Sequence, residues 1–176
     1  MSMSTKSLTT NRKRLAASAL VAGIAVTGLA VNPATTGEAD AATKIRTKNV
    51  ERADQLRERI ADIATAQKGD RYSLGSVGPG AFDCSGLVNF AYRKATGKVL
   101  PRTSYQLAGS LERVSRKNRK VGDIALYRGN GHVGIYVGKG RIAQALNSRT
   151  GVIVDRADEG WNRSMIYAYG RVIQTK

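Results

Sequence analysis

The hydrophobic pattern of this 176-residue chain changes its period near residue 120. Before that point, apolar residues recur at the spacing that is typical of amphipathic helices. After it come short runs rich in Val, Ile and Tyr, namely "VGDIALY", "HVGIYVG", "RIAQAL", "GVIVD" and "MIYAYGRVI". Such runs, separated by Gly, Asn, Lys or Asp, indicate consecutive antiparallel strands. Helices followed by strands predict an α+β domain.

Three helices are expected in the first part of the chain. Residues 48–67 place apolar side chains on one face, and residues 85–94 do the same before Gly97. A third, short helix is expected to begin where Thr103 or Ser104 can cap it. The basic cluster at residues 113–120 is expected to be a loop.

The first 41 residues have the organisation of an export signal. A basic stretch precedes an uninterrupted apolar run at residues 15–31, and a polar segment then ends in Ala39-Asp40-Ala41. This pattern predicts a secretory signal peptide, residues 1–41, that is cleaved before Ala42. An uncleaved membrane anchor is the alternative, although the run is slightly shorter than the ~20 residues that span a bilayer.

The charge of the chain bears on its partners. It contains 29 Lys and Arg against 13 Asp and Glu, a formal net charge of +16. Such a balance often indicates nucleic-acid binding, but export argues against nucleic acid as a partner. The abundant polyanion outside a bacterial cell is the envelope, so we expect attraction to anionic cell-wall polymers. A basic surface that only improves solubility is the alternative.

Cys84 is the only cysteine and His132 the only histidine. A single cysteine excludes an internal disulfide. One cysteine and one histidine cannot make a usual zinc site, so no metal is expected. Cys84 follows Asp83, a good helix N-cap, which places the sulfur in a first helical turn where the helix dipole lowers a thiol pKa. A buried cysteine that acts as a small hydrophobe is the alternative.

His132 opens a predicted strand and shares a face with Gly134, whose missing side chain would let another element approach. A cysteine at a helix N-terminus that faces a histidine on a strand is the arrangement of a thiolate–imidazolium pair. The imidazole takes the thiol proton and later protonates the leaving amine. Spacing alone does not show that Cys84 and His132 meet, because they are far apart in the sequence.

Several segments resemble, in order, the NlpC family (the NlpC and p-sixty group) of bacterial cell-wall cysteine endopeptidases. They are "GDRYSLG", "FDCSGLV", "LPRTS", "VGDIALY" and "HVGIYVG". The resemblance implies a papain-like catalytic domain at residues 60–176, preceded by an N-terminal helical extension at residues 42–59. It implies that the cysteine-bearing helix packs on the sheet and that no cofactor is needed. The implied substrate is the stem peptide of peptidoglycan, commonly cut between D-glutamate and a diamino acid. We expect a monomer.

The same resemblance implies roles for individual residues. Cys84 matches the nucleophile, His132 the base, and Gln144 the third polar residue, which is often a histidine in the family. "LPRTS" is interpreted as a turn and helix cap. Three further positions match residues that line the cleft or hold the stem peptide, although packing, helix capping and backbone hydrogen bonding would also explain them: Tyr72, Asp83 and Ser85.

A register argument connects Gln144 with His132. Both numbers are even, so the two residues share a sheet face only if the turn near Gly138 has an odd number of loop residues or a bulge. We predict such a turn. We also expect the Gln144 oxygen to accept the Nδ1–H of His132, which would leave Nε2 toward the sulfur.

The leading hypothesis is therefore a secreted peptidoglycan endopeptidase that forms a thioester on Cys84. Two other functions remain open. One is an amidase or acyl transferase on the same scaffold, and the other is a non-catalytic cationic protein that binds the cell wall.

Overall fold

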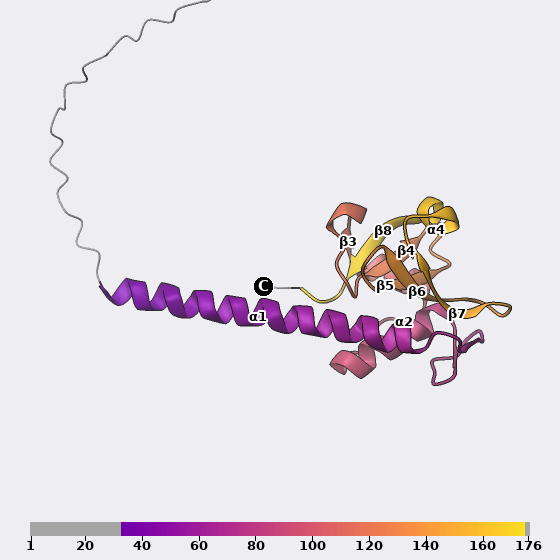
Figure 1. Ribbon diagram of the computed structural model, residues 1–176, viewed down its shortest axis with the longest axis horizontal. Coiled ribbons are helices and arrows are strands. Elements are labelled where there is room, and N and C mark those ends of the chain that lie inside the picture. The colour runs from indigo at the N-terminus through magenta and orange to yellow at the C-terminus, as the bar shows by residue number, and fades with distance from the viewer. Residues whose placement is uncertain (1–32, 175–176) are drawn as a thin grey trace, which may run out of the picture.

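One antiparallel sheet of six strands organises the computed structural model, which describes residues 33–174. The strand order is β3-β8-β4-β5-β6-β7, and helices α1 and α2 lie on one side of the sheet with α4 on the other (Figure 1). This arrangement confirms the α+β prediction. The strands of the sheet are β3 (Glu112–Val114), β4 (Ile124–Tyr127), β5 (Val133–Tyr136), β6 (Arg141–Asn147), β7 (Gly151–Arg156) and β8 (Ile166–Arg171).

Helix α1 runs unbroken from Pro33 to Ala66 and is longer than the sequence predicts. It crosses the boundary at 59/60 that separates the expected extension from the expected domain. Its side chains are exposed from residue 38 to residue 49, and its buried face begins at Ala53 and continues through Ile60 and Ala64. The expected extension at residues 42–59 therefore begins as exposed helix and already joins the buried face at Ala53 and Arg57.

Most of the expected signal peptide lies outside the described residues. Of its 41 positions, only residues 33–41 are described, and they belong to α1. Side chains 38–41 are exposed, so cleavage before Ala42 would remove none of the buried side chains that the structure describes. Between residues 33 and 174, no helix is both long enough and apolar enough to cross a membrane.

Helix α2 (Cys84–Thr96) confirms the second predicted helix. Gly97 ends it with a φ of 75°, a left-handed conformation that glycine adopts without steric cost. Helix α3 (Ser104–Ser110) confirms the third, and Thr103 is its cap. Two further short elements precede α2 as a parallel pair, β1 (Arg71–Tyr72) and β2 (Ala81–Phe82).

Both faces of the sheet are buried, so its strands alternate between two cores. Ile124 and Leu126 of β4 pack toward α1 and α2, whereas Ala125 and Tyr127 pack into a second cluster on the opposite face. Strand β5 follows the same alternation, with Val133 and Ile135 toward the helices. This alternation directs the odd and even residues of β5 and β6 into different environments.

The expectation of a plain loop at residues 113–120 is wrong. Part of the cluster forms β3, which pairs with β8, and part forms the 3-10 turn η1 (Arg116–Asn118). The charges conceal this pairing in the sequence because β3 is a short edge strand with two exposed residues. Helix α4 (Gly160–Met165) is also absent from the sequence prediction.

Candidate active site

Cys84 is the first residue of α2, and Asp83 caps the helix by accepting a hydrogen bond from the backbone N–H of Gly86 at 2.7 Å. The predicted position of the cysteine is therefore confirmed, but the expected direction of its pKa is wrong. Burial raises the pKa of the Cys84 thiol, because the residue is only 9% exposed. The backbone N–H groups of Val133, Ser85 and Cys84 itself point at the sulfur and oppose this effect without overcoming it.

His132 precedes β5 and is flanked by residues that touch the cysteine site. Gly131 lines the same cleft as Cys84, and the N–H of Val133 points at the sulfur. Burial lowers the pKa of His132, while the hydrogen bond with Gln144 and the negative charge of Asp155 raise it in part. Both shifts favour the uncharged forms, a neutral imidazole on His132 and a neutral thiol on Cys84.

The turn between β5 and β6 has the odd number of residues that the register argument predicts. Ile135 pairs with Ala143, and the N–H of Val137 bonds to the carbonyl of Arg141, which leaves a three-residue turn at 138–140. His132 and Gln144 consequently share a face. The predicted contact between them is confirmed, with 2.7 Å between the His132 ring and Gln144 Oε1.

The ring nitrogen in this contact is Nε2, so the expectation that Nδ1 would face Gln144 is wrong. Gln144 Nε2 donates to Asp155 Oδ1 at 3.1 Å, and a carboxylate can only accept. This contact fixes the amide with its oxygen toward the ring. Nε2 of a neutral His132 therefore carries the proton, and Nδ1 is the free acceptor for a thiol proton.

Gln144 is fully buried, and its amide is held on several sides. Its nitrogen also lies 3.3 Å from Asn162 Oδ1, and the Tyr127 hydroxyl lies 3.1 Å from its oxygen. Asn162 in turn donates to Asp155 at 2.9 Å. This network leaves the amide no unpaired polar atom and holds the His132 ring in one orientation.

Gly134 lets β6 approach β5 closely, as the sequence predicts. A Cβ at this position would lie 2.7 Å from Ile142 Cγ2 and 3.2 Å from Gln144 Cβ. Real Cβ atoms do not come so close to a neighbouring side chain. The absence of a side chain at Gly134 therefore helps to place Gln144 against the histidine.

The cysteine opens into a cleft of about 420 Å³ that contains all three predicted substrate-binding residues. Burial raises the pKa of Tyr72, and the neighbouring Cys84 and Asp83 raise it further. Tyr72 is partly exposed and comes from β1. The cleft lining is Tyr72, Leu74, Gly75, Asp83, Cys84, Ser85, Arg102, Thr103, Ser104 and Gly131.

Asp83 and Ser85 are engaged by internal partners. Asp83 is 5% exposed and accepts hydrogen bonds from the N–H of Gly75 and from the guanidinium of Arg102. Arg102 also donates to the Ser85 hydroxyl at 2.8 Å. Burial alone would raise the pKa of Asp83, but the hydrogen bonds from Arg102, Gly86 and Gly75 hold it below its usual value.

His132 lines a second, larger cleft of about 830 Å³, together with residues of α4 and β7. Trp161 of α4 is half exposed there, stacks on Tyr127 at 4.9 Å between ring centroids, and lies 5.8 Å from the His132 ring. Cys84 thus lines the first cleft and His132 the second.

Sequence reasoning missed the residues that hold the predicted ones in place. Arg102 lies in "LPRTS", where Thr103 is indeed a helix cap but the arginine also binds Asp83 and Ser85. Asp155 ends "GVIVD", and its single acidic side chain at the end of an apolar strand was the available signal. Asn162 lies in α4, which has no periodic pattern to reveal it.

The profile of the NlpC/P60 family matches residues 69–170, more than half of the chain. The chain belongs to the NlpC/P60 family. Over 92 residues it is 47% identical to a probable endopeptidase of Corynebacterium glutamicum, which covers 52% of this chain and 44% of the relative. Over 115 residues it is 36% identical to the murein DD-endopeptidase MepS/murein LD-carboxypeptidase of Escherichia coli K12, covering 64% of this chain and 61% of the relative.

The fold of the chain is that of solved NlpC/P60 domains. RipD of Mycobacterium tuberculosis, described as a non-catalytic NlpC/p60 domain protein adapted to peptidoglycan binding, superposes with a TM-score of 0.56 at 26% identity. The match covers 66% of this chain and 97% of RipD. The NlpC/P60 chain described here spans about half the length of the curated Corynebacterium relative.

Proposed function

We propose that this NlpC/P60 chain is an exported peptidoglycan endopeptidase that cleaves stem peptides through a thioester on Cys84. The observation that supports the proposal most strongly is the hydrogen-bonded series from His132 through Gln144 to Asp155. Cys84 opens helix α2, and the backbone of Val133, the residue after His132, acts on its thiol. The buried Gln144 amide fixes Nε2 of His132, and this orients Nδ1 for proton transfer.

The proposed reaction begins with a neutral thiol and imidazole. As the Cys84 sulfur attacks the scissile carbonyl carbon, its proton passes to Nδ1 of His132. His132 then gives this proton to the leaving amine, and the acyl fragment stays on the sulfur as a thioester. Water attacks the thioester with His132 as the base, which releases the carboxylic acid and restores the thiol.

Two groups are suited to stabilise the oxyanion of this reaction. The backbone N–H of Cys84 lies at the positive end of α2, and Tyr72 lines the same cleft as Cys84. Gln144 positions His132, and its neutral amide stabilises an imidazolium less than a carboxylate in direct contact would.

The cleft chemistry favours a role for Arg102 in substrate binding over direct roles for Asp83 and Ser85. The oxygens of Asp83 and Ser85 are occupied by internal donors. The Arg102 side chain is 41% exposed at the cleft and is positively charged, so it can meet a carboxylate of a stem peptide. We propose the bond between D-glutamate and the diamino acid as the site of cleavage.

Purified muropeptides of defined structure provide the test. The wild-type chain should convert them to two smaller products whose summed mass exceeds that of the substrate by one water, and mass spectrometry of the products identifies the bond. A product joined to a second amine would instead indicate an acyl transferase, and release of ammonia would indicate an amidase. Unchanged muropeptides would contradict the proposal.

Export is part of the proposal and is tested separately. We propose that the signal peptide is removed before Ala42 and that the product is secreted or associated with the cell wall. N-terminal sequencing of the protein from culture supernatant should begin at Ala42. Recovery of only the full-length chain in membranes would support an uncleaved anchor instead.

A non-catalytic wall-binding function is the second candidate, and one observation favours it. RipD shares this fold and is described as non-catalytic. The presence of Cys84, His132 and a hydrogen-bonded Gln144 in one site argues for catalysis in this chain. The muropeptide experiment separates the two functions, because a binding protein would leave the substrate intact.

A further inference from the structure

A basic pocket of about 860 Å³ lies outside the two clefts of the catalytic site. We define it by its lining residues, Arg116, Lys117, Arg119, Tyr136, Asp158 and Arg163. The lining combines four cationic side chains with one carboxylate, which leaves three positive charges uncompensated. None of these cations takes part in the catalytic network described above.

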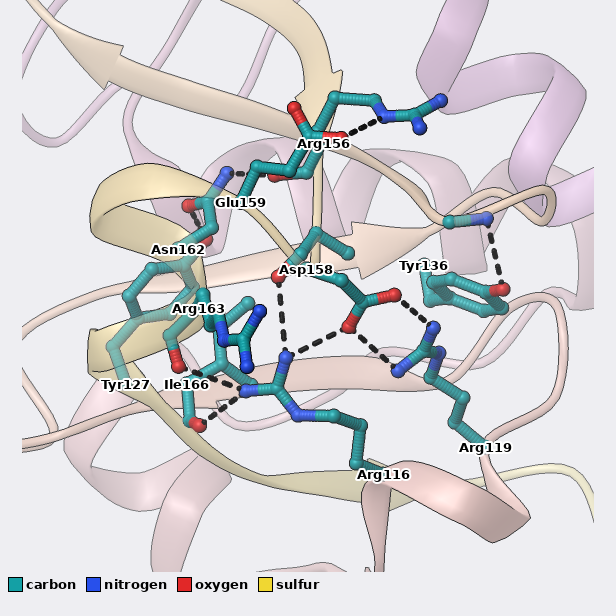
Figure 2. Close-up of polar contacts among 12 residues, drawn as sticks. Arg116, Arg119, Tyr127, Tyr136, Arg156, Asp158, Glu159, Asn162, Arg163 and Ile166 are labelled. Carbon is teal, nitrogen blue, oxygen red and sulfur yellow. Dashed lines mark hydrogen bonds and ion pairs between the residues drawn. The ribbon is translucent and has the colours of Figure 1, made fainter.

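The floor of the basic pocket is rigid. Figure 2 shows Arg116 and Arg119 both reaching Asp158, with Arg116 Nη1 2.7 Å and Arg119 Nη1 3.0 Å from Asp158 Oδ1. Arg116 also donates to the backbone carbonyls of Arg163 and Ile166 at 3.0 Å. These contacts hold the guanidinium groups in place before any ligand arrives.

Aromatic rings fix Arg119 further. Its guanidinium carbon lies 4.7 Å from the ring centroid of Tyr136 and 5.5 Å from that of Tyr169. A stacked guanidinium keeps its edge available for planar or tetrahedral anions. Asp158 therefore orients the two arginines but does not neutralise the pocket.

The contacts of Arg116 and Arg119 could serve only to anchor the loop between β7 and α4. That role does not explain Lys117 and Arg163, which are exposed at the pocket and form no ion pair within residues 33–174. Two unpaired cations beside two fixed ones make a surface that is suited to an anion with several oxygens.

The basic pocket and the catalytic site share a wall. Helix α4 places Trp161 in the cleft of His132 and Asn162 in the network around Gln144. The residue after Asn162, Arg163, lines the basic pocket, and Figure 2 shows both side chains. A polymer held in the pocket would thus lie one short helix away from the reacting groups.

We propose that the basic pocket binds the phosphate or carboxylate groups of an anionic cell-wall polymer and so holds the wall beside the catalytic cleft. This proposal rests on the peptidoglycan function only in naming the cell wall as the source of the polymer. The phosphate and carboxylate groups share the chemistry that the arginines and the lysine recognise, and the experiment distinguishes their sources.

The test uses the Cys84→Ala chain, so that binding is measured whether or not the protein hydrolyses peptidoglycan. Poly(glycerol phosphate) and polyglucuronate of matched length are titrated at low and physiological salt. The variant carries Lys117→Glu and Arg163→Glu, both at exposed positions. The matched control carries Arg93→Glu and Lys98→Glu, which make the same change in net charge at exposed positions at the end of α2. Circular dichroism and thermal unfolding verify that both variants are folded.

The pocket variant should bind about tenfold more weakly or worse at low salt, and the control should change by less than about twofold. If the pocket variant loses affinity for poly(glycerol phosphate) alone, the ligand is phosphate, and if it loses affinity for polyglucuronate alone, the ligand is carboxylate. Weaker binding of both polymers supports a site for either group. Equal weakening in the pocket variant and the control would show diffuse charge attraction and overturn the proposal. Failure of the parent chain to bind either polymer would also overturn it.

Discussion

The most informative single substitution is Asp155→Asn, because it removes a charge while keeping a hydrogen-bond acceptor. Asp155 Oδ1 accepts from Gln144 Nε2 at 3.1 Å and from Asn162 Nδ2 at 2.9 Å. An asparagine oxygen can accept both bonds, so Gln144 should keep its orientation toward His132. The variant therefore isolates the electrostatic effect of Asp155 on the imidazole.

The expected magnitude follows from the geometry of the network. Two hydrogen bonds and the Gln144 amide separate His132 from Asp155. His132 Nε2 and Asp155 Oδ1 are therefore no more than about 8 Å apart. At an effective dielectric constant of about 20 to 40, Coulomb attraction over that distance is about 1–2 kcal/mol. Asp155 is partly exposed, so we take the lower value of about 1 kcal/mol.

The sign of the effect is fixed by which form of His132 is active. Asp155 raises the pKa of His132 against the larger effect of burial, so its neutralisation should lower that pKa further. More of the imidazole is then neutral at acidic pH. The acidic limb of kcat/KM should therefore move to lower pH. The plateau should fall about fivefold, because the imidazolium formed during acylation loses about 1 kcal/mol of stabilisation.

The assay is the pH dependence of stem-peptide hydrolysis, with Asp62→Asn as control. Asp62 is an exposed residue of α1, and its substitution removes the same charge. Asp155→Ala should reduce turnover more than Asp155→Asn, since it also frees the Gln144 amide to rotate. An Asp155→Asn profile that matches the wild type in both limb and plateau would refute the reasoning, as would an equal shift in the Asp62→Asn control.

Two further predictions concern residues that support the site. Gln144→Ala should reduce kcat/KM for the stem peptide without abolishing it, and Gln144→His should retain substantial activity. Unchanged turnover in Gln144→Ala would remove Gln144 from the mechanism and leave only a Cys–His dyad. Arg102→Ala should lower the free energy of unfolding at neutral pH by about 1–3 kcal/mol in urea denaturation, because it leaves the buried Asp83 carboxylate without its charged partner. The pKa of Asp83 lies below its usual value, so this stabilisation is present above pH ~4 and disappears as acid protonates Asp83. An equal loss in the exposed control Arg93→Ala would contradict the assignment.

Local signals in the sequence predict the elements that carry the nucleophile. Asp83 as a cap and Gly97 as a stop flank the observed helix α2, and the predicted span 85–94 falls one residue short at its start and two at its end. Parity of residue numbers was enough to require the odd turn that brings Gln144 to His132, because side chains alternate strictly along a strand. These features depend on neighbours in the chain and on one tight turn.

The features that the sequence did not predict depend on distant segments. The pKa of Cys84 depends on how deeply α2 is buried against β5, and no local sequence pattern predicts that depth. The proton of neutral His132 lies on Nε2 because Asp155 orients the Gln144 amide with its oxygen toward that nitrogen. Arg119 appeared to be part of a solvated cluster, yet it is stacked on tyrosines of β5 and β8.

The central claim is that Cys84 performs the chemistry, and the most direct measurement is the hydrolysis rate of a defined muropeptide by wild-type and Cys84→Ala chains. The substitution removes the sulfur and little volume, so the fold should survive, as circular dichroism can verify. We expect the rate to fall by at least about a thousandfold. Hydrolysis by a folded Cys84→Ala chain within about tenfold of the wild-type rate would contradict the cysteine mechanism.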